Sequence, residues 1–349
     1  MIRIIEGIMQ NIKYKDLFQY RSVWMGFAII WIMIYHSELI VENRLLWMIK
    51  NVGYCGVDLF FFASGIGCYY SYQRLKDPYA FMKRRISRII PPYWIFLTVL
   101  CLTRLAAGTL RPGTVIGDYL CLEYFVDPEL DLAFNWYMGS IWVMYLLVPY
   151  FWQLIEKHGQ KSLLIIPLLL LASTVFWHQT HFILTATRVP IFFIGMYYEY
   201  LALNDREMSG KDYLKLLIMA AIGFAVLVPS RLLITDNEIM WGCGVLFYPF
   251  ILMTPFICIT MSLICRIGNP VIQGLRKLFE LAGRYSFELY LVHHLIFELG
   301  ARYFRGTPPF VTTWFWFVLY LAAVPAAWLL NRAAVLFSRL FQKINCVNN

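Results

Sequence analysis

The chain consists of long apolar runs separated by short polar connections. A helix needs roughly 20 apolar residues to cross the hydrocarbon core of a bilayer, and several runs approach that length. The pattern predicts an all-α, polytopic membrane protein with about ten transmembrane helices around a central pore or cleft. The expected spans are 22–40, 52–72, 89–107, 136–155, 162–178, 187–203, 213–230, 243–265, 281–299 and 311–331.

Composition supports this class. Of the 349 residues, 60% are hydrophobic and 15% are charged, whereas a soluble domain has about 25% charged residues. No long polar segment separates the runs, so we expect residues 1–349 to form a single membrane domain without an appended soluble domain. The eight cysteines are scattered, mostly inside apolar runs, and none has metal or redox spacing, which indicates small packing residues.

The distribution of basic residues predicts the orientation. The net charge of +9 could suggest a nucleic-acid partner, but in a membrane protein the position of the charges in the loops is the better guide. With the N-terminus in the cytoplasm, cytoplasmic segments hold 22 of the 30 lysines and arginines. We therefore expect a multi-pass protein of the cell membrane, with both termini cytoplasmic and no nucleic-acid partner.

The first span carries almost no polar residue before His36. An ionisable side chain within a membrane span is a candidate functional residue. At a rise of about 1.5 Å per residue, His36 lies about 22 Å along the helix from Arg21, at the other side of the membrane. We expect the chemistry to take place along this line.

The second span contains Asp58 at a depth similar to that of His36. A carboxylate that accepts a hydrogen bond from one imidazole nitrogen fixes the tautomer and raises the basicity of the other nitrogen. This predicts a catalytic pair of His36 and Asp58. In the alternative interpretation, Asp58 caps a helix or binds an arginine.

The connection after the second span is basic. Arg85 and Arg88 are three residues apart, on one face of a helix end, with Lys83 and Arg84 beside them. Such a cluster can bind the phosphates of a nucleotide through bidentate hydrogen bonds. More often, a basic run beside a span is a topology signal or a contact to anionic lipid.

Six segments occur together in the order and spacing of a known family. They are RSVWMGFAIIWIMIYH from Arg21 to His36, then GVDLFFFASG, RRISRIIPPYW, NWYMGSIWVMYLLVPYF, RVPIFFIG and LAGRYSFELYLVHHLIF. With these segments, the sequence resembles the acyltransferase type 3 family of membrane O-acyltransferases.

The resemblance implies a ten-helix core that takes an acyl group, usually acetyl, from acyl-coenzyme A in the cytoplasm and passes it to a hydroxyl of an exported glycan or a similar acceptor. It implies that His36 is catalytic and that Arg85 and Arg88 bind the donor. Acyl-CoA is then a donor substrate, and no permanently bound cofactor is expected. The other expected partners are a glycan or lipid-linked saccharide and membrane lipids.

One position departs from the family pattern. The family commonly has an arginine eleven residues before the histidine, where this chain has Met25. Arg21 lies one helical turn earlier on nearly the same face and can reach the same place. We therefore expect Arg21 to take part in donor binding.

Three later residues are candidates for acceptor binding, namely Trp136, Arg188 and His293. Trp136 begins the fourth span, where an aromatic ring either anchors the helix at the interface or stacks on a sugar. Arg188 could hold an acidic acceptor or pair with Asp58. His293 is an acceptor-binding candidate or makes a structural hydrogen bond to a neighbouring helix.

The pair of histidines in HQTH, at 178 and 181, has helical metal spacing but no acidic partner nearby, and no metal is expected.

In the expected mechanism His36 acts as the general base on the acceptor hydroxyl. An acyl-histidine or an acyl-Ser64 intermediate is the minor alternative. The rival class is a transporter or flippase for a lipid-linked or anionic substrate, in which His36 and Asp58 relay protons. A third possibility is an enzyme that acts wholly at the cytoplasmic face.

Overall fold

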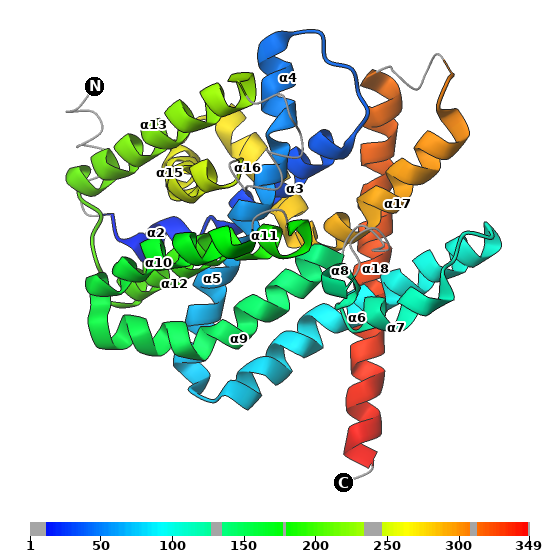
Figure 1. The fold of residues 1–349 in the computed structure, drawn as a ribbon, viewed down its shortest axis with the longest axis horizontal. Coiled ribbons are helices and arrows are strands. Elements are labelled where there is room, and N and C mark those ends of the chain that lie inside the picture. The colour runs from blue at the N-terminus through cyan, green and yellow to red at the C-terminus, as the bar shows by residue number, and fades with distance from the viewer. Residues whose placement is uncertain (1–11, 127–134, 177–178, 234–245, 308–312, 348–349) are drawn as a thin grey trace.

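The computed structural model describes residues 12–126, 135–176, 179–233, 246–307 and 313–347 (Figure 1). Over these residues the chain is helical, with one isolated β-bridge between Lys13 and Glu207, so the predicted all-α fold is confirmed. The main helices are α2 (Tyr14–Phe18), α3 (Arg21–His36), α4 (Arg44–Asn51), α5 (Gly56–Leu75), α6 (Pro78–Ala106), α7 (Val115–Tyr119), α8 (Glu123–Val126), α9 (Asn135–His158), α10 (Ile165–Ser173), α11 (Thr180–Ala186), α12 (Val189–Leu203), α13 (Gly210–Leu233), α15 (Tyr248–Cys265), α16 (Pro270–Arg284), α17 (Ser286–Phe304) and α18 (Thr313–Val347).

Within the described part of the chain, six helical stretches are long and apolar enough to cross a membrane, so the predicted number of about ten is not confirmed. α3 and α12 contain 16 and 15 residues, which gives lengths of about 24 and 22 Å, below the hydrocarbon thickness of about 30 Å. The expected spans 136–155 and 162–178 belong to one such stretch, interrupted at Gly159, where φ is +51°. The six stretches are Arg44–Leu75, Pro78–Ala106, Trp136–Phe176, Gly210–Arg231, Tyr248–Cys265 and Thr313–Arg339.

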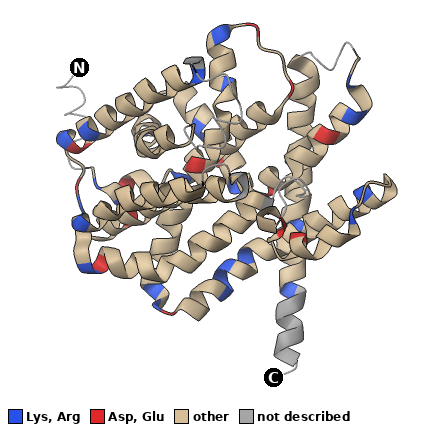
Figure 2. Ribbon diagram, in the orientation of Figure 1, with Lys and Arg blue, Asp and Glu red and all other residues tan. Residues whose placement is uncertain are grey.

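Short, buried helices form the centre of the molecule. Most side chains of α5 and α12 are buried, whereas α13 and α18 expose large apolar side chains such as Ile222, Phe224, Phe317 and Leu321. In Figure 1, α13 and α15 lie on one side of α5, and α17 and α18 lie on the other. Lys, Arg, Asp and Glu lie mainly towards helix ends and connections, and most helix centres are free of them (Figure 2). Exposed apolar helices around a packed centre are typical of a protein surrounded by lipid.

The N-terminal segment is attached to the connection between α12 and α13. The Tyr14 N–H donates a hydrogen bond to the Arg206 carbonyl over 3.1 Å. Lys15 forms an exposed ion pair with Asp205 and holds the pKa of that carboxyl below its usual value. These contacts fix the chain just before α3 begins at Arg21.

α3 and α16 cross with their backbones in contact. A Cβ atom on Gly26 would lie 1.8 Å from the Phe279 carbonyl oxygen, and one on Gly283 would lie 1.8 Å from the Ser22 carbonyl oxygen. Small residues that let helix backbones approach are the usual basis of tight packing in membrane helices. The crossing sets the position of α3 against the element that leads into α17.

Candidate active site

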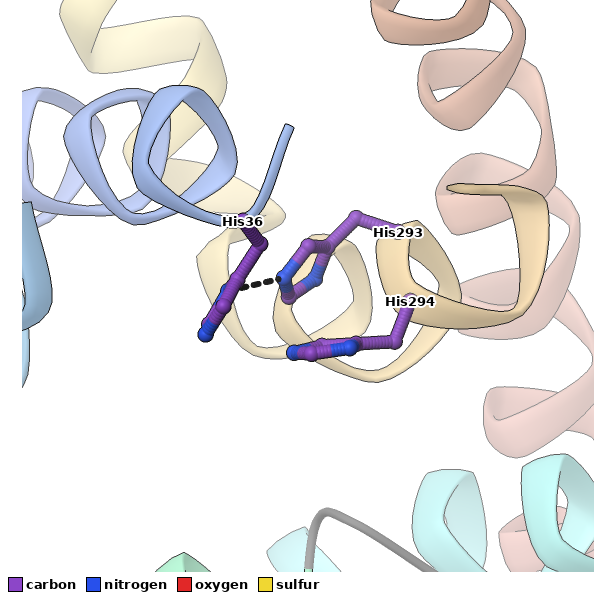
Figure 3. Close-up of side chains that lie close together, drawn as sticks. All are labelled: His36, His293 and His294. Atoms are coloured by element: carbon purple, nitrogen blue, oxygen red, sulfur yellow. Dashed lines mark hydrogen bonds between the residues drawn. The ribbon is translucent and has the colours of Figure 1, made fainter. Parts of the chain in front are cut away.

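Three histidines from two helices meet at one end of α3. His36 is the last residue of α3, and His293 and His294 are neighbours on α17 (Figure 3). His36 Nδ1 and His293 Nε2 lie 3.1 Å apart, which is hydrogen-bond distance. The imidazole of His293 is fully buried. The structure therefore joins two histidines that are 257 residues apart in the chain.

A second hydrogen bond determines which nitrogens carry protons. His293 Nδ1 lies 2.9 Å from the Leu289 carbonyl oxygen. A carbonyl can only accept, so His293 Nδ1 donates, and in the neutral ring His293 Nε2 is left as an acceptor. His36 Nδ1–H must then donate to it, which leaves a lone pair on His36 Nε2. That nitrogen points away from His293 (Figure 3).

His36 lines a cavity of about 290 Å³ that we call the histidine cavity. Its wall contains two ion pairs: Arg104 Nη2 lies 2.8 Å from Glu298 Oε2, and Arg305 pairs with Glu38. The lining residues are His36, Glu38, Leu100, Arg104, His294, Leu295, Phe297, Glu298, Ala301, Arg305 and Trp316. The cavity therefore combines an imidazole with charged and hydrogen-bonding groups.

A larger cavity of about 980 Å³, the basic cavity, is rich in arginine. It contains all three residues that the sequence predicts for donor binding, and Glu288 is the acidic residue in its lining. Asn331 Nδ2 donates a hydrogen bond to that carboxylate over 2.7 Å. The arginines that line the cavity are Arg21, Arg84, Arg85, Arg88, Arg284 and Arg339. Such a surplus of guanidinium groups suits a polyanion.

Two of these arginines meet at Gly67 on α5. Arg85 Nη2 donates to the Gly67 carbonyl oxygen over 2.6 Å, and the Arg85 guanidinium lies over the rings of Phe81 and Tyr145. A Cβ atom on Gly67 would lie 2.8 Å from Arg21 Nη1. A side chain at this position would therefore push Arg21 away, and the glycine lets the two guanidinium groups converge.

The two cavities lie towards opposite ends of α6. Arg88 lines the basic cavity and Arg104 lines the histidine cavity, and sixteen residues of helix separate them by about 24 Å. α3 links the cavities in the same way, because Arg21 lines the first and His36 lines the second.

Aromatic rings stand between the cavities. Phe60 and Tyr137 line the basic cavity, and the Tyr290 ring packs on both of them, with centroid distances of 6.4 and 4.8 Å. Tyr290 in turn lies 5.9 Å from the His293 ring. His36 is not among the residues that line the basic cavity. Among the described residues, the arginines and His36 therefore line separate cavities, and these rings lie between the two.

Asp58 and Arg188 pair with each other. Arg188 Nε lies 3.4 Å from Asp58 Oδ1, and both side chains are buried. No described hydrogen bond joins Asp58 to His36, so the pairing with histidine expected from the sequence is not found, and the arginine alternative describes the contact. α5 and α12 approach closely because both helices have glycine at the contact. A Cβ atom on Gly65 or Gly195 would lie only 2.2 Å from a carbonyl oxygen of the other helix.

The three acceptor-binding candidates lie apart from the lining of both cavities. Arg188 donates to the Leu184 carbonyl oxygen, and its guanidinium lies 3.8 Å from the centroid of the Phe247 ring. Trp136 is half-buried beside the same guanidinium. His293 contacts His36 instead. His178 and the side chain of His181 lie outside the described residues.

Sequence reasoning missed three residues that the structure brings to the cavities: His294, Arg284 and Arg339. His294 adjoins a predicted site residue, and the doublet of histidines in a span was a signal that could have found it. Arg284 lies in the segment LAGRYSFELYLVHHLIF, which also contains His293 and His294. The sequence around Arg339 does not indicate a cavity residue, because a basic residue after the last span is common in membrane proteins.

The comparisons with known proteins identify a family. A family model described as an acyltransferase domain, of acyltransferase type 3, matches residues 24–332. No curated protein and no solved structure matches the chain. The matched region includes His36, His293 and His294 and four of the six arginines of the basic cavity; Arg21 and Arg339 lie just outside it. The chain therefore belongs to the acyltransferase type 3 family and is a membrane acyltransferase.

Proposed function

We propose that this protein transfers an acetyl or other short acyl group from acyl-CoA to a hydroxyl of an exported or cell-surface glycan. It acts in the cell membrane, with both termini in the cytoplasm and the basic cavity open to the cytoplasmic side. The acceptor reaches the histidine cavity from the outer side. This arrangement follows the distribution of 22 of 30 basic residues in the expected cytoplasmic segments.

The donor binds in the basic cavity. Coenzyme A carries several phosphates on its nucleotide end, and charge-assisted hydrogen bonds from guanidinium groups are the strong, directional way to hold them. Arg85 and Arg88 project from the same part of α6, and Arg21 reaches them from α3. A volume of about 980 Å³ is ample for a ligand of this size. No cofactor is permanently bound, because the donor is consumed in each turnover.

His36 is the general base. Its Nε2 takes the proton of the acceptor hydroxyl as that oxygen attacks the thioester carbonyl. The carbon–sulfur bond breaks, the thiolate of coenzyme A takes the proton back from His36, and the products are an ester and free coenzyme A. His293 orients the base by accepting the hydrogen bond from His36 Nδ1. Direct transfer is preferred to an acyl-Ser64 intermediate, because the described contacts of the Ser64 hydroxyl are with Cys68 and Tyr145 and not with a histidine that could activate it.

Asp58 then has a positioning role at a distance from the chemistry. Its carboxylate faces Arg188 at the start of α12, so the pair holds α5 and α12 in place around the site. A proton relay between His36 and Asp58, as a transporter would need, has no hydrogen bond between these two groups to support it. The family match favours the transferase, and so does the fact that Asp58 pairs with Arg188 while His36 pairs with His293.

The observation that carries the proposal is the hydrogen-bond chain from Leu289 through His293 to His36. It leaves a bare nitrogen on a residue that lines one cavity, beside a second cavity rich in arginine. A base and a polyanion site on one helix are the two parts that acyl transfer from coenzyme A requires.

The donor site can be tested directly. Arg85→Ala or Arg88→Ala should weaken binding of acetyl-CoA to the protein in nanodiscs by about 10- to 100-fold, because each lost charged hydrogen bond costs about 1.5–3 kcal/mol. Lys157→Ala, an exposed basic residue at the end of α9 outside the cavity, is the matched control and should bind normally. Unchanged affinity in both arginine variants would rule out the basic cavity as the donor site.

The acceptor class has its own test. Cell-surface glycan from cells with and without the active protein should differ in mass by one acetyl group per modified sugar. Proton-coupled uptake measured in parallel in proteoliposomes should be absent. Uptake without any acyl transfer would establish the transporter instead.

A further inference from the structure

The two neighbouring histidines on α17 face His36 as a group of three. The ring centroid of His294 lies 4.1 Å from that of His36 and 4.4 Å from that of His293. One nitrogen from each ring can be chosen so that all three lie within 4.8 Å of one another. The hydrogen bond joins two of these rings, and the His294 ring packs against both of them (Figure 3).

We propose that His36, His293 and His294 form a binding site for a divalent transition metal of the zinc class. Neutral imidazole nitrogens are preferred zinc ligands, and three of them with an open fourth position are a common arrangement. At a zinc–nitrogen distance of about 2.0–2.1 Å, tetrahedral geometry places ligand nitrogens about 3.3 Å apart. His36 Nδ1 and His293 Nε2 are already 3.1 Å apart. Rotation of the half-buried His294 ring brings in the third ligand.

The surroundings fit a metal as well. A metal-binding histidine usually donates its other N–H to a carbonyl or carboxylate, which orients the ring. His293 already makes this contact with the Leu289 carbonyl oxygen. Two rings of the group also line the histidine cavity, so that water or an acceptor oxygen can reach a fourth position. The carboxylates of Glu38 and Glu298 line the same cavity, where Arg305 and Arg104 balance their charge, so the histidine rings are the ligands.

Metal binding would switch off the base, and this part rests on the proposed function. A metal on His36 Nε2 occupies the lone pair directly. A metal on Nδ1 forces the ring proton onto Nε2, because the neutral imidazole keeps one N–H. In either case His36 can no longer take a proton from a hydroxyl. The site is therefore inhibitory, and zinc competes with turnover.

The binding site is tested by titrating Co²⁺, and then Zn²⁺, into the full-length protein in nanodiscs, purified without a polyhistidine tag. Wild type should bind one Co²⁺ per chain with the visible absorption of a tetrahedral site, and Zn²⁺ should displace it. His294→Ala should weaken binding by at least about tenfold. His158→Ala, an exposed histidine at the end of α9, is the matched control and should bind like wild type.

A second variant keeps the test decisive if His294→Ala does not fold. His294→Cys supplies a thiolate in place of the imidazole, so it should add a sulfur-to-cobalt charge-transfer band in the near ultraviolet. No tetrahedral Co²⁺ absorption in wild type would overturn the site. Equal affinity in wild type and His294→Ala would also overturn it, because the third ligand would then be elsewhere.

The inhibitory role is read from transfer rates with and without Zn²⁺. Zinc at a concentration that saturates the site should reduce the wild-type rate at least tenfold, and a chelator should restore it. In His294→Ala, the ratio of the transfer rate without Zn²⁺ to the rate with Zn²⁺ should fall towards 1. Saturated protein that transfers at its full rate would overturn inhibition while leaving the metal site standing. If no transfer is found even without metal, the proposed function fails and the cobalt titration still decides the site.

Discussion

The position of one proton, on His293 Nδ1, sets the donors and acceptors of the hydrogen bonds in the histidine cluster. Because the Leu289 carbonyl fixes the proton on His293 Nδ1, the proton of His36 is held on its own Nδ1. The nitrogen that remains bare is the one turned away from His293 (Figure 3). The hydrogen bond from His293 to Leu289 therefore leaves His36 Nε2 able to accept a proton.

Replacing the acceptor in this hydrogen bond tests that assignment. His293→Phe keeps a ring but cannot accept from His36 Nδ1, so kcat should fall by a large part of the about 10²- to 10⁴-fold that a positioned base contributes. The KM for acetyl-CoA should stay unchanged. His293→Gln offers an oxygen acceptor and should recover part of the rate. Equal rates in the two variants would show that His293 acts only through packing.

At the scale of elements, α3 carries at its two ends both groups that the proposed mechanism uses. Its first residue, Arg21, lines the basic cavity and its last, His36, lines the histidine cavity. The helix spans about 24 Å over 16 residues. A shift along its axis would misplace both groups at once, and the close crossing with α16 at Gly26 prevents such a shift.

The crossing can be loosened by one side chain. Gly26→Val should lower the thermal midpoint and the transfer rate together, because its Cβ would overlap the Phe279 carbonyl oxygen and overpacking costs about 1–3 kcal/mol or more. Gly274→Ala on α16 is the matched control, since a Cβ there meets nothing within 4 Å. It should be neutral or slightly stabilising. A Gly26→Val protein with normal melting and activity would refute the role of this contact.

At the scale of the whole molecule, two cavities are separated by rings. Under the proposed function, acyl-CoA bound in the basic cavity would meet Phe60 and Tyr137 before it reached the histidines. We therefore expect the thioester to advance only when these side chains turn aside, and the closed rings to keep water from the donor. The barrier is a consequence of how α5, α9 and α17 pack together.

Removing one of these rings should allow hydrolysis of the donor without transfer to an acceptor. Tyr137→Ala should raise hydrolysis of acetyl-CoA in the absence of acceptor, because water and thioester can then meet at His36. Tyr137→Phe keeps the ring and should behave like wild type. Tyr150→Ala, an exposed tyrosine on the same helix, controls for loss of an aromatic side chain. If hydrolysis stays at the wild-type level in Tyr137→Ala, the rings do not form the barrier.

Much of the fold and part of the site could be predicted from the sequence. Apolar runs gave the helical membrane class, and Arg21, Arg85 and Arg88 do share a cavity. The predicted number of about ten spans is not confirmed, because central helices such as α12, with 15 residues, are shorter than a full span. Local pattern shows length and polarity but cannot show which helix lies next to which.

The partner of His36 illustrates that limit. Asp58 is near in sequence and similar in expected depth, yet its carboxylate faces Arg188, and a histidine 257 residues away along the chain takes the contact. Only tertiary packing brings α3 against α17. The same reason explains why the cluster with His294 was not foreseen.

The most direct test is single-turnover transfer by His36→Ala, with acetyl-CoA binding measured on the same preparation. The proposed mechanism predicts a rate that falls by about 10²- to 10⁴-fold, while donor affinity and thermal midpoint stay near the wild-type values. Wild-type transfer by a variant that binds acetyl-CoA normally would contradict it, because another group would then have to take the proton.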